Sequence, residues 1–414
     1  MYKHGLHSKN EANHSSEFSI ILANLCYVLV LAGLAVLLYH LFYGQVFYNN
    51  VSKRFPSDTP FYVLGKDQTP RLISWLLPLL YQGGSGAPRI AVVLTAFVLL
   101  TCVGVRLLVR ELLNKDTAHA MKAKDVWLEV TFSLIPLFMA SIYLPVIYPY
   151  FYSVAWSGYP LHSPTYLLMV LAGVFTIWLF LKIYRLYFNA SARRLLPYYI
   201  GLAFTLLISA AAKPNFSMVF LPMLLIVALY QIFFGHVNLS RGKRFYRSLP
   251  FILVVLPTLA YYLLLALSLR GTVSGQMAFG ISGLFFTGNV FLKIVLALVF
   301  PLVVSVLHFR QIRHEMPFFL TWGMFIVGCV IFLCFYQTGP QYDSRNFEWG
   351  LLCGLVFVNV YNVSLLIKDW KKIGPEHQIS LAKPILETVL LAFHLVCGLA
   401  WFWIYLHGGP GWSV

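Results

Sequence analysis

The chain has 414 residues, of which 59% are hydrophobic and only 11% are charged, whereas soluble domains carry about 25% charged residues. This composition excludes an ordinary soluble enzyme or binding domain and indicates an integral membrane protein. The formal net charge of +16 is spread thinly over short segments between apolar runs, so anionic lipid headgroups explain it better than nucleic acid does.

Apolar runs of about 18 to 25 residues recur along the chain, and each is long enough to cross a hydrocarbon core of about 30 Å as a helix. The first run is too long for a signal-peptide core and lacks a small-residue cleavage site, so we expect it to remain as an anchor. The predicted fold class is an all-α polytopic membrane helix bundle. Its eleven transmembrane helices are predicted at 19–42, 88–109, 127–148, 165–184, 196–212, 216–234, 249–269, 288–308, 318–337, 349–367 and 386–406.

The distribution of Lys and Arg predicts the orientation, because basic loops stay on the cytoplasmic side. One set of alternate segments holds 21 of the 30 basic residues. The N-terminus is therefore predicted to be cytoplasmic and the C-terminus outside. We expect a cytoplasmic tail at 1–18, a single transmembrane domain at 19–406 and a short outward tail at 407–414.

The first outward segment, 43–87, is the longest and most polar of the predicted outward loops. It contains Asp58 in the sequence Phe-Pro-Ser-Asp-Thr-Pro. A short apolar stretch at 73–80 cannot span a membrane and is interrupted by Pro78, so we expect an interfacial or re-entrant helix there.

Few acidic residues fall on the predicted outward side: Asp58, Asp67, Asp343 and Glu348. If the protein performs acid/base chemistry outside, the base is expected among these four. Asp58 is favoured because the prolines on either side of it restrict the backbone. The alternative for Asp58 is a helix N-cap.

Two other outward segments contain isolated polar residues. His162, in Leu-His-Ser-Pro-Thr-Tyr166, is the one histidine placed firmly in an outward loop between spans, and it fits a structural role at a helix start equally well. Lys213 joins two apolar spans, where it either snorkels to the headgroups or meets an anion. The helix predicted to start just after Lys213 would point its first amides outward, which favours phosphate.

The fifth outward loop, 337–350, places Asp343, Arg345 and Glu348 close together in sequence. An internal ion pair would explain them. Alternatively, Arg345 could bind a phosphate through two parallel hydrogen bonds, and Trp349 could stack on a substrate ring.

These motifs, in this order and topology, resemble the GT-C superfamily of integral-membrane glycosyltransferases, and locally a group of bacterial GT-C-like proteins. The matching elements are Ser57-Asp58, His162-Ser-Pro-Thr-Tyr166, Lys213-Pro-Asn-Phe216 and Gly339 through Arg345-Asn-Phe-Glu-Trp-Gly350. The chain departs from that group after Asp58, where Thr-Pro-Phe-Tyr-Val replaces an expected second polar residue.

The resemblance implies transfer of a sugar from a polyprenyl-phosphate-linked donor to an acceptor glycan or lipid outside a bacterial cytoplasmic (inner) membrane, as in cell-surface polysaccharide assembly. Asp58 would be the catalytic base, and Lys213 and Arg345 would bind the donor phosphate. The implied substrate-binding residues are His162, Tyr166, Asn346, Glu348 and Trp349. We expect no cofactor, no metal and no nucleotide site, because no phosphate-binding glycine motif and no paired Asp-x-Asp array occurs.

Two other functions remain open. A polysaccharide polymerase or ligase would use the same polyprenyl-linked glycans, although such proteins usually have larger outward loops than this chain. A transporter or lipid flippase would carry charges near the membrane midplane and paired broken helices. Lys293 is the main charge within a predicted span, and no convincing internal repeat accompanies it.

Overall fold

The computed structural model describes residues 4–47, 57–64, 71–82, 86–113, 122–144, 160–187, 190–234, 240–268, 277–280, 290–338, 346–373 and 380–407. The described part is almost entirely helical. Its elements, in chain order, are α1 (His4–Phe47), α3 (Thr59–Val63), α4 (Leu72–Tyr81), α5 (Gly86–Leu113), α6 (Ala123–Ser133), the 3-10 turn η1 (Ile135–Leu137), α7 (Pro164–Leu186), α8 (Ala192–Ala212), α9 (Asn215–Phe234), α10 (Arg241–Leu253), α11 (Leu256–Ser268), β1 (Met277–Phe279), α13 (Val290–Ile312), α14 (Met316–Cys334), β2 (Phe335–Gln337), α15 (Glu348–Lys372) and α16 (Ala382–Leu406).

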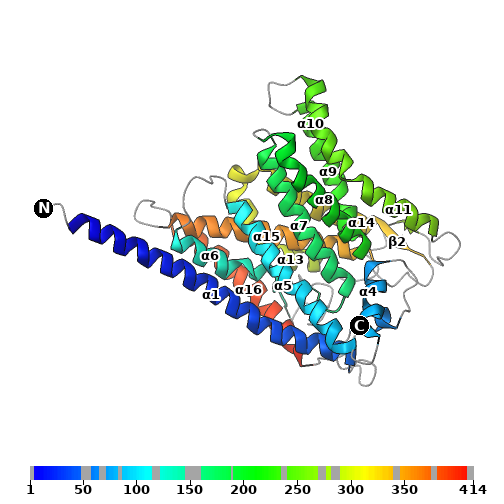
Figure 1. Ribbon diagram of the computed structural model, residues 1–414, viewed down its shortest axis with the longest axis horizontal. Helices are drawn as coiled ribbons and strands as arrows, with labels where there is room; N and C mark the ends of the chain where they lie inside the picture. The colour runs from blue at the N-terminus through cyan, green and yellow to red at the C-terminus, as the bar shows by residue number, and fades with distance from the viewer. Residues whose placement is uncertain are drawn as a thin grey trace.

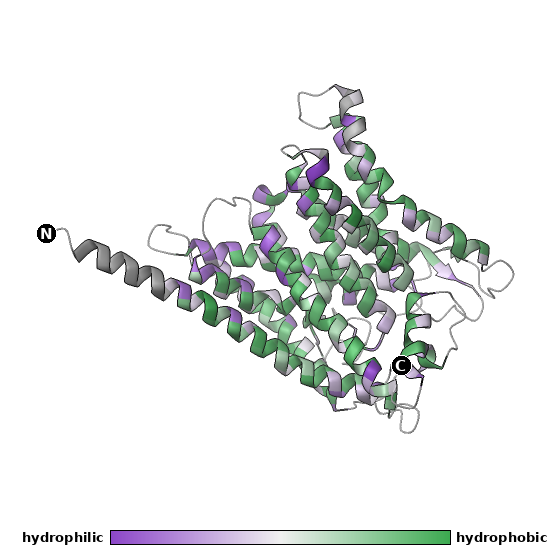
Figure 2. Cartoon of the chain, in the orientation of Figure 1, coloured by the Kyte–Doolittle hydropathy of each residue, from purple (hydrophilic) through white to green (hydrophobic). Residues whose placement is uncertain are grey.

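The predicted all-α polytopic bundle is confirmed (Figure 1). Ten helical stretches among the described residues are long and apolar enough to cross a membrane, the first of them at Ser16–Phe47 within α1. The end of α10 and all of α11 make up one of these stretches, Ser248–Ser268. Figure 2 shows hydrophobic residues along the bodies of the helices, and hydrophilic residues gathered around the start of α6 and the end of α15.

The prediction of a spanning helix at 127–148 is wrong. Helix α6 ends at Ser133, the turn η1 follows, and residues 138–144 lack helical structure. Pro136 explains the break, because a proline cannot donate the helical hydrogen bond and its ring clashes with the preceding turn. The apolar run correctly indicated a segment that packs among the helices, but it wrongly predicted one continuous helix there.

Neighbouring helices satisfy the non-helical backbone at 138–144. The Ala140 amide donates to the carbonyl of His394 on α16 at 3.2 Å, and His394 Nδ1 lies 2.7 Å from the Ala140 carbonyl oxygen. The Ile142 amide donates to the carbonyl of Leu296 on α13 at 3.2 Å. Irregular backbone among apolar helices persists only when protein groups satisfy it in this way.

Helix α15 is the centre of the bundle, and every residue of its apolar spanning window is buried. It packs against α5, α6, α9, α13, α14 and α16. Its closest neighbour is α14, because glycines let the two backbones touch. A methyl group added at Gly354 would lie 2.7 Å from the Phe325 Cα, and one added at Gly328 would lie 2.7 Å from the Leu351 Cα. Small residues allow this kind of close helix crossing in membrane proteins.

One end of the bundle collects ion pairs from the segments that the charge count assigns to the cytoplasm. The Glu129 carboxylate on α6 is fully buried and accepts from Arg106 Nε at 2.7 Å and Arg110 Nη2 at 2.8 Å. Glu111 pairs with Arg185 at 2.9 Å. This end also contains Asp369, near the end of α15, and we call it the Asp369 end.

The opposite end contains Asp58 and those parts of the predicted outward loops that the structure describes, and we call it the Asp58 end. The short helix predicted at 73–80 is confirmed as α4. Strands β1 and β2 form an antiparallel pair, with Ala278 opposite Tyr336, and this pairing was not predicted. The two strands follow α11 and α14, so segments far apart in sequence meet at this end.

The close crossing of α14 and α15 leads to a stability prediction. Gly354→Ala places a methyl group against the Phe325 backbone, which cannot move without shifting α14. We expect the substitution to reduce stability by about 1–3 kcal/mol, measured as a lower melting temperature of the detergent-purified protein. The matched control is Gly33→Ala on α1, where the added methyl group meets no atom within 4 Å. Equal melting temperatures for the two variants would contradict the close backbone contact between α14 and α15 at Gly354.

Candidate functional site

Asp58 lies at the Asp58 end, at the N-cap position of α3, directly before Thr59 and Pro60. Proline suits the first turn of a helix because its missing N–H would have no helical partner there. Asp58 does occupy the N-cap position, as the alternative predicted. Its side chain, however, makes no capping hydrogen bond. The Asp58 carboxylate is therefore not used to cap α3.

The backbone around Asp58 is fastened to the segment that precedes α7. The Asp58 amide donates to the carbonyl oxygen of His162 at 3.0 Å, and Ser57 Oγ donates to the same oxygen at 2.9 Å. Residues more than 100 positions apart in the chain are thus held side by side. The Ser57-Asp58 motif and the His162 motif belong to one local structure.

His162 and Tyr166 meet Trp349, which is in the first turn of α15. The His162 and Trp349 rings are 5.5 Å apart between centroids, and the Tyr166 and Trp349 rings are 5.1 Å apart. His162 is only 3% exposed and Tyr166 is fully buried. The three rings form one aromatic cluster that joins the start of α7 to the start of α15.

Lys213 lies between α8 and α9 and points at the same cluster. Its ammonium nitrogen is 3.8 Å from the centroid of the Trp349 ring, a cation–π contact. The residue is only 5% exposed, so its ammonium is covered by protein rather than extended toward headgroups. Helix α9 begins two residues later, and its first amides make that helix end favourable for an anion.

Two other residues of the loop predicted at 337–350, Asn346 and Glu348, lie at the start of α15. Asn215 Nδ2 donates to the Asn346 carbonyl at 2.6 Å, and Asn346 Nδ2 donates to Gln337 Oε1 at 2.6 Å. Glu348 is buried in the first turn of α15, where a carboxylate interacts favourably with the helix dipole. Arg345, the second predicted phosphate ligand, lies outside the described residues, as do the alternative acids Asp67 and Asp343.

Burial controls the protonation of the two basic groups. The pKa of Lys213 is lowered to about 7, chiefly by burial; the negative charge of Asp58 opposes this change, and the positive charge of Arg71 adds to it. Burial also lowers the pKa of His162 to about 4, against the opposing influence of Asp58. At neutral pH burial therefore favours an uncharged His162 imidazole and makes Lys213 lose its proton far more readily than an exposed lysine does. An anion beside Lys213 would restore its full charge.

Sequence reasoning missed the residue that ties this region together, Gln45 near the end of α1. Gln45 Nε2 donates to the Tyr405 hydroxyl at 2.9 Å and to the Leu161 carbonyl at 3.3 Å, and Gln45 Oε1 lies 3.1 Å from Ser57 Oγ. Gln45 is fully buried. Its signal in the sequence was an amide at the end of an apolar run, where such a residue needs a partner inside the protein.

The arrangement therefore combines a carboxylate, a neutral imidazole, a lysine with a lowered pKa and a tryptophan from four segments of the chain. Such a group can accept a proton and bind an anion. No protein-family model matches this sequence, and no curated protein matches it either.

Anion binding at Lys213 should depend on pH. Dibutyl phosphate is a suitable probe, because a phosphodiester keeps one negative charge throughout the range. We expect its affinity for the detergent-purified protein to be constant below pH 6.5 and to fall above about pH 7, approaching tenfold per pH unit, as Lys213 loses its proton. Isothermal titration calorimetry between pH 6 and 9 would measure this.

The matched control for this experiment is Lys213→Arg, since a guanidinium stays protonated throughout the range. We expect the arginine variant to bind dibutyl phosphate with little dependence on pH. A wild-type protein whose affinity does not change between pH 6 and 9 would contradict the assignment of Lys213 as the anion ligand.

Proposed function

We propose that this protein is a membrane glycosyltransferase that moves a sugar from a polyprenyl-phosphate-linked donor to an acceptor glycan or lipid. We place the reaction on the extracytoplasmic face of a bacterial cytoplasmic (inner) membrane. The observation that carries the proposal is the meeting of Asp58, His162, Lys213 and Trp349 at one end of an apolar bundle. An acid and a cation placed together there suit a reaction that removes a proton and releases a phosphate.

The Asp58 carboxylate would act as the general base. It takes the proton from an acceptor hydroxyl as that oxygen forms its bond to the anomeric carbon of the donor. The bond between the anomeric carbon and the phosphate oxygen breaks, and its electron pair stays on the phosphate. The products are the glycosylated acceptor and the polyprenyl phosphate, with the proton on Asp58.

Lys213 and the first amides of α9 would stabilise the charge that develops on the departing phosphate. Because one face of the Trp349 ring contacts the Lys213 ammonium, Trp349 is better suited to orient Lys213 than to stack on a sugar. This changes the role that the sequence suggested for Trp349. His162, neutral at working pH, would hydrogen-bond a substrate hydroxyl rather than bind the phosphate by charge.

A narrow apolar pocket adjoins the site. Leu161, the neighbour of His162, lines it together with Met139 and Trp401. Part of its wall is the non-helical chain at 138–144. The pocket is too narrow in this structure to hold a hydrocarbon chain, so a lipid-linked donor is supported by the position of the polar cluster at the end of an apolar bundle.

The test is reconstitution of the protein in liposomes with a panel of polyprenyl-phosphate sugars and glycan or lipid acceptors. Loss of a general base typically costs about 10²- to 10⁴-fold in rate, so we expect Asp58→Asn to lower transfer by that factor. The matched control is Asp125→Asn at the Asp369 end, where Asp125 pairs with Lys371 at 3.7 Å. We expect the control to transfer sugar at the wild-type rate.

Three results would oppose the proposal. Full transfer by Asp58→Asn would remove Asp58 as the base. Absence of transfer with every donor, together with movement of a solute across the liposome membrane, would indicate a transporter. Products that grow by whole repeat units instead of single sugars would indicate a polymerase.

A further inference from the structure

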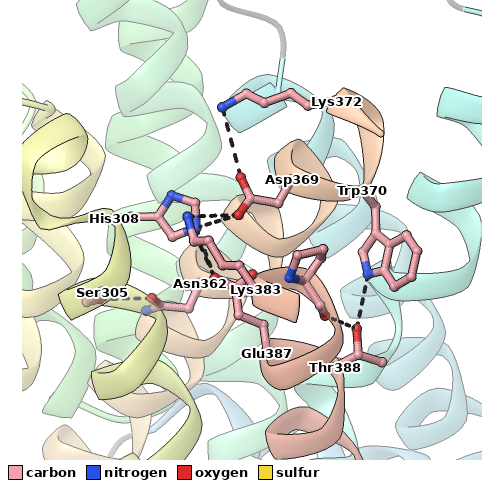
Figure 3. Close-up of polar contacts among 10 residues, drawn as sticks. Ser305, His308, Asn362, Asp369, Trp370, Lys372, Lys383, Glu387 and Thr388 are labelled. Carbon is pink, nitrogen blue, oxygen red and sulfur yellow. Dashed lines mark hydrogen bonds and ion pairs between the residues drawn. The ribbon is translucent and has the colours of Figure 1, made fainter. Parts of the chain in front are cut away.

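A second buried polar cluster lies at the Asp369 end, far from the candidate site. It consists of His308 on α13, Asp369 on α15 and Glu387 on α16 (Figure 3). Asp369 is nearly six helical turns beyond Glu348 on α15, a distance of about 30 Å along the helix axis. The cluster therefore cannot take part in chemistry at Asp58, and sequence reasoning did not identify it.

The spacing of the three side chains matches the ligands of a metal ion. His308 Nε2 lies 3.1 Å from Glu387 Oε1 and 3.3 Å from Asp369 Oδ2, and one ligand atom from each residue lies within 4.8 Å of the others. A tetrahedral Zn²⁺ ion with bonds of about 2.0–2.2 Å holds neighbouring ligand atoms roughly 3.3 Å apart. An imidazole and two carboxylates are also ligands that divalent first-row metals accept.

The burial of the cluster adds an independent reason to expect a cation. Glu387 is 0% exposed, and its Oε2 atom has no hydrogen-bond partner among the residues that the structure describes. A buried carboxylate oxygen without a partner is costly unless a positive charge is close. His308 contacts only the other oxygen of this carboxylate.

Lysine side chains supply part of that charge. Lys383 Nζ is 2.8 Å from Asp369 Oδ2 and 4.0 Å from Glu387 Oε1. The Lys383 side chain is 27% exposed, so it can leave the carboxylates by rotating toward solvent. Lys372 Nζ is 3.9 Å from the other Asp369 oxygen. Lys383 thus lies where a metal ion would have to displace it.

A hydrogen bond between the neighbouring residues holds the Asp369 and Glu387 carboxylates close together. Trp370, next to Asp369, donates from Nε1 to Thr388 Oγ1 at 3.0 Å, and Thr388 is next to Glu387 (Figure 3). This bond fixes α15 against α16 beside the cluster. Ligands positioned by such neighbours need little rearrangement to bind a metal.

We propose that His308, Asp369 and Glu387 bind one divalent transition-metal ion, of which Zn²⁺ is the best fit, and that Lys383 competes with the metal for the carboxylates. The ion replaces the Lys383 charge, neutralises both carboxylates and joins α13, α15 and α16 at the Asp369 end. This proposal does not depend on the function proposed for Asp58.

The experiment is a Zn²⁺ titration of the full-length protein, purified in detergent and stripped with a chelator. We expect one tight site per chain by calorimetry and elemental analysis, and a visible absorption spectrum typical of low coordination number when Co²⁺ replaces Zn²⁺. Glu387→Gln keeps the shape of the side chain but removes its charge, so it should weaken Zn²⁺ binding at least tenfold.

Two further variants distinguish a metal site from a purely structural ion-pair network. Lys383→Met removes the competing cation and should strengthen Zn²⁺ binding severalfold, whereas loss of an ion pair alone would only destabilise the protein. His314→Gln is the matched control, because His314 is an exposed histidine at the same end and should leave binding unchanged. Absence of a stoichiometric site in the wild type would overturn the proposal. So would wild-type affinity in Glu387→Gln, or weaker binding in Lys383→Met.

Discussion

The complete burial of the apolar stretch of α15 is the constraint on which the rest of the structure depends. A helix that is covered on all sides must touch every neighbour closely, and Gly354 meets this demand by letting α14 come into backbone contact. Because α15 is held in place along its length, the residues at its two ends are held as well. At one end the Trp349 ring contacts the Lys213 ammonium. At the other end the Asp369 carboxylate contacts Lys383 and His308. One rigid helix therefore positions two polar clusters that share no residue.

The Asp58 end shows how an apolar protein can build a polar site without a soluble domain. Each polar group there is contributed by the end of a different helix, and the links between them are side-chain bonds to backbone oxygens, as from Ser57 to His162 and from Gln45 to Leu161. Burial then gives the groups useful properties. It keeps His162 neutral and brings the pKa of Lys213 to about 7, so that a bound anion changes the charge of the site.

Apolar runs and basic loops predicted the fold class, the approximate positions of ten spans and the short helix α4, because these features are local in the sequence. The segment at 127–148 was predicted incorrectly because its backbone is satisfied by His394, some 250 residues away. The census of outward acids and the motif order selected residues that do lie together, including Asp58, His162 and Lys213. Gln45 was missed because it looks like the end of a span. The His308 cluster was missed because its three members come from separate helices, and its acids were assigned to cytoplasmic helix ends.

The function that we propose requires Asp58 and Lys213 to act on one phosphate-linked substrate, with Trp349 orienting Lys213. An experimental structure of the protein in lipid nanodiscs with a prenyl phosphodiester bound tests it most directly. We expect the phosphate to lie against Lys213 Nζ and the first amides of α9, with the Asp58 carboxylate facing the carbon attached to the phosphate. A phosphate bound elsewhere in the bundle, or an Asp58 side chain turned away from it, would contradict the account.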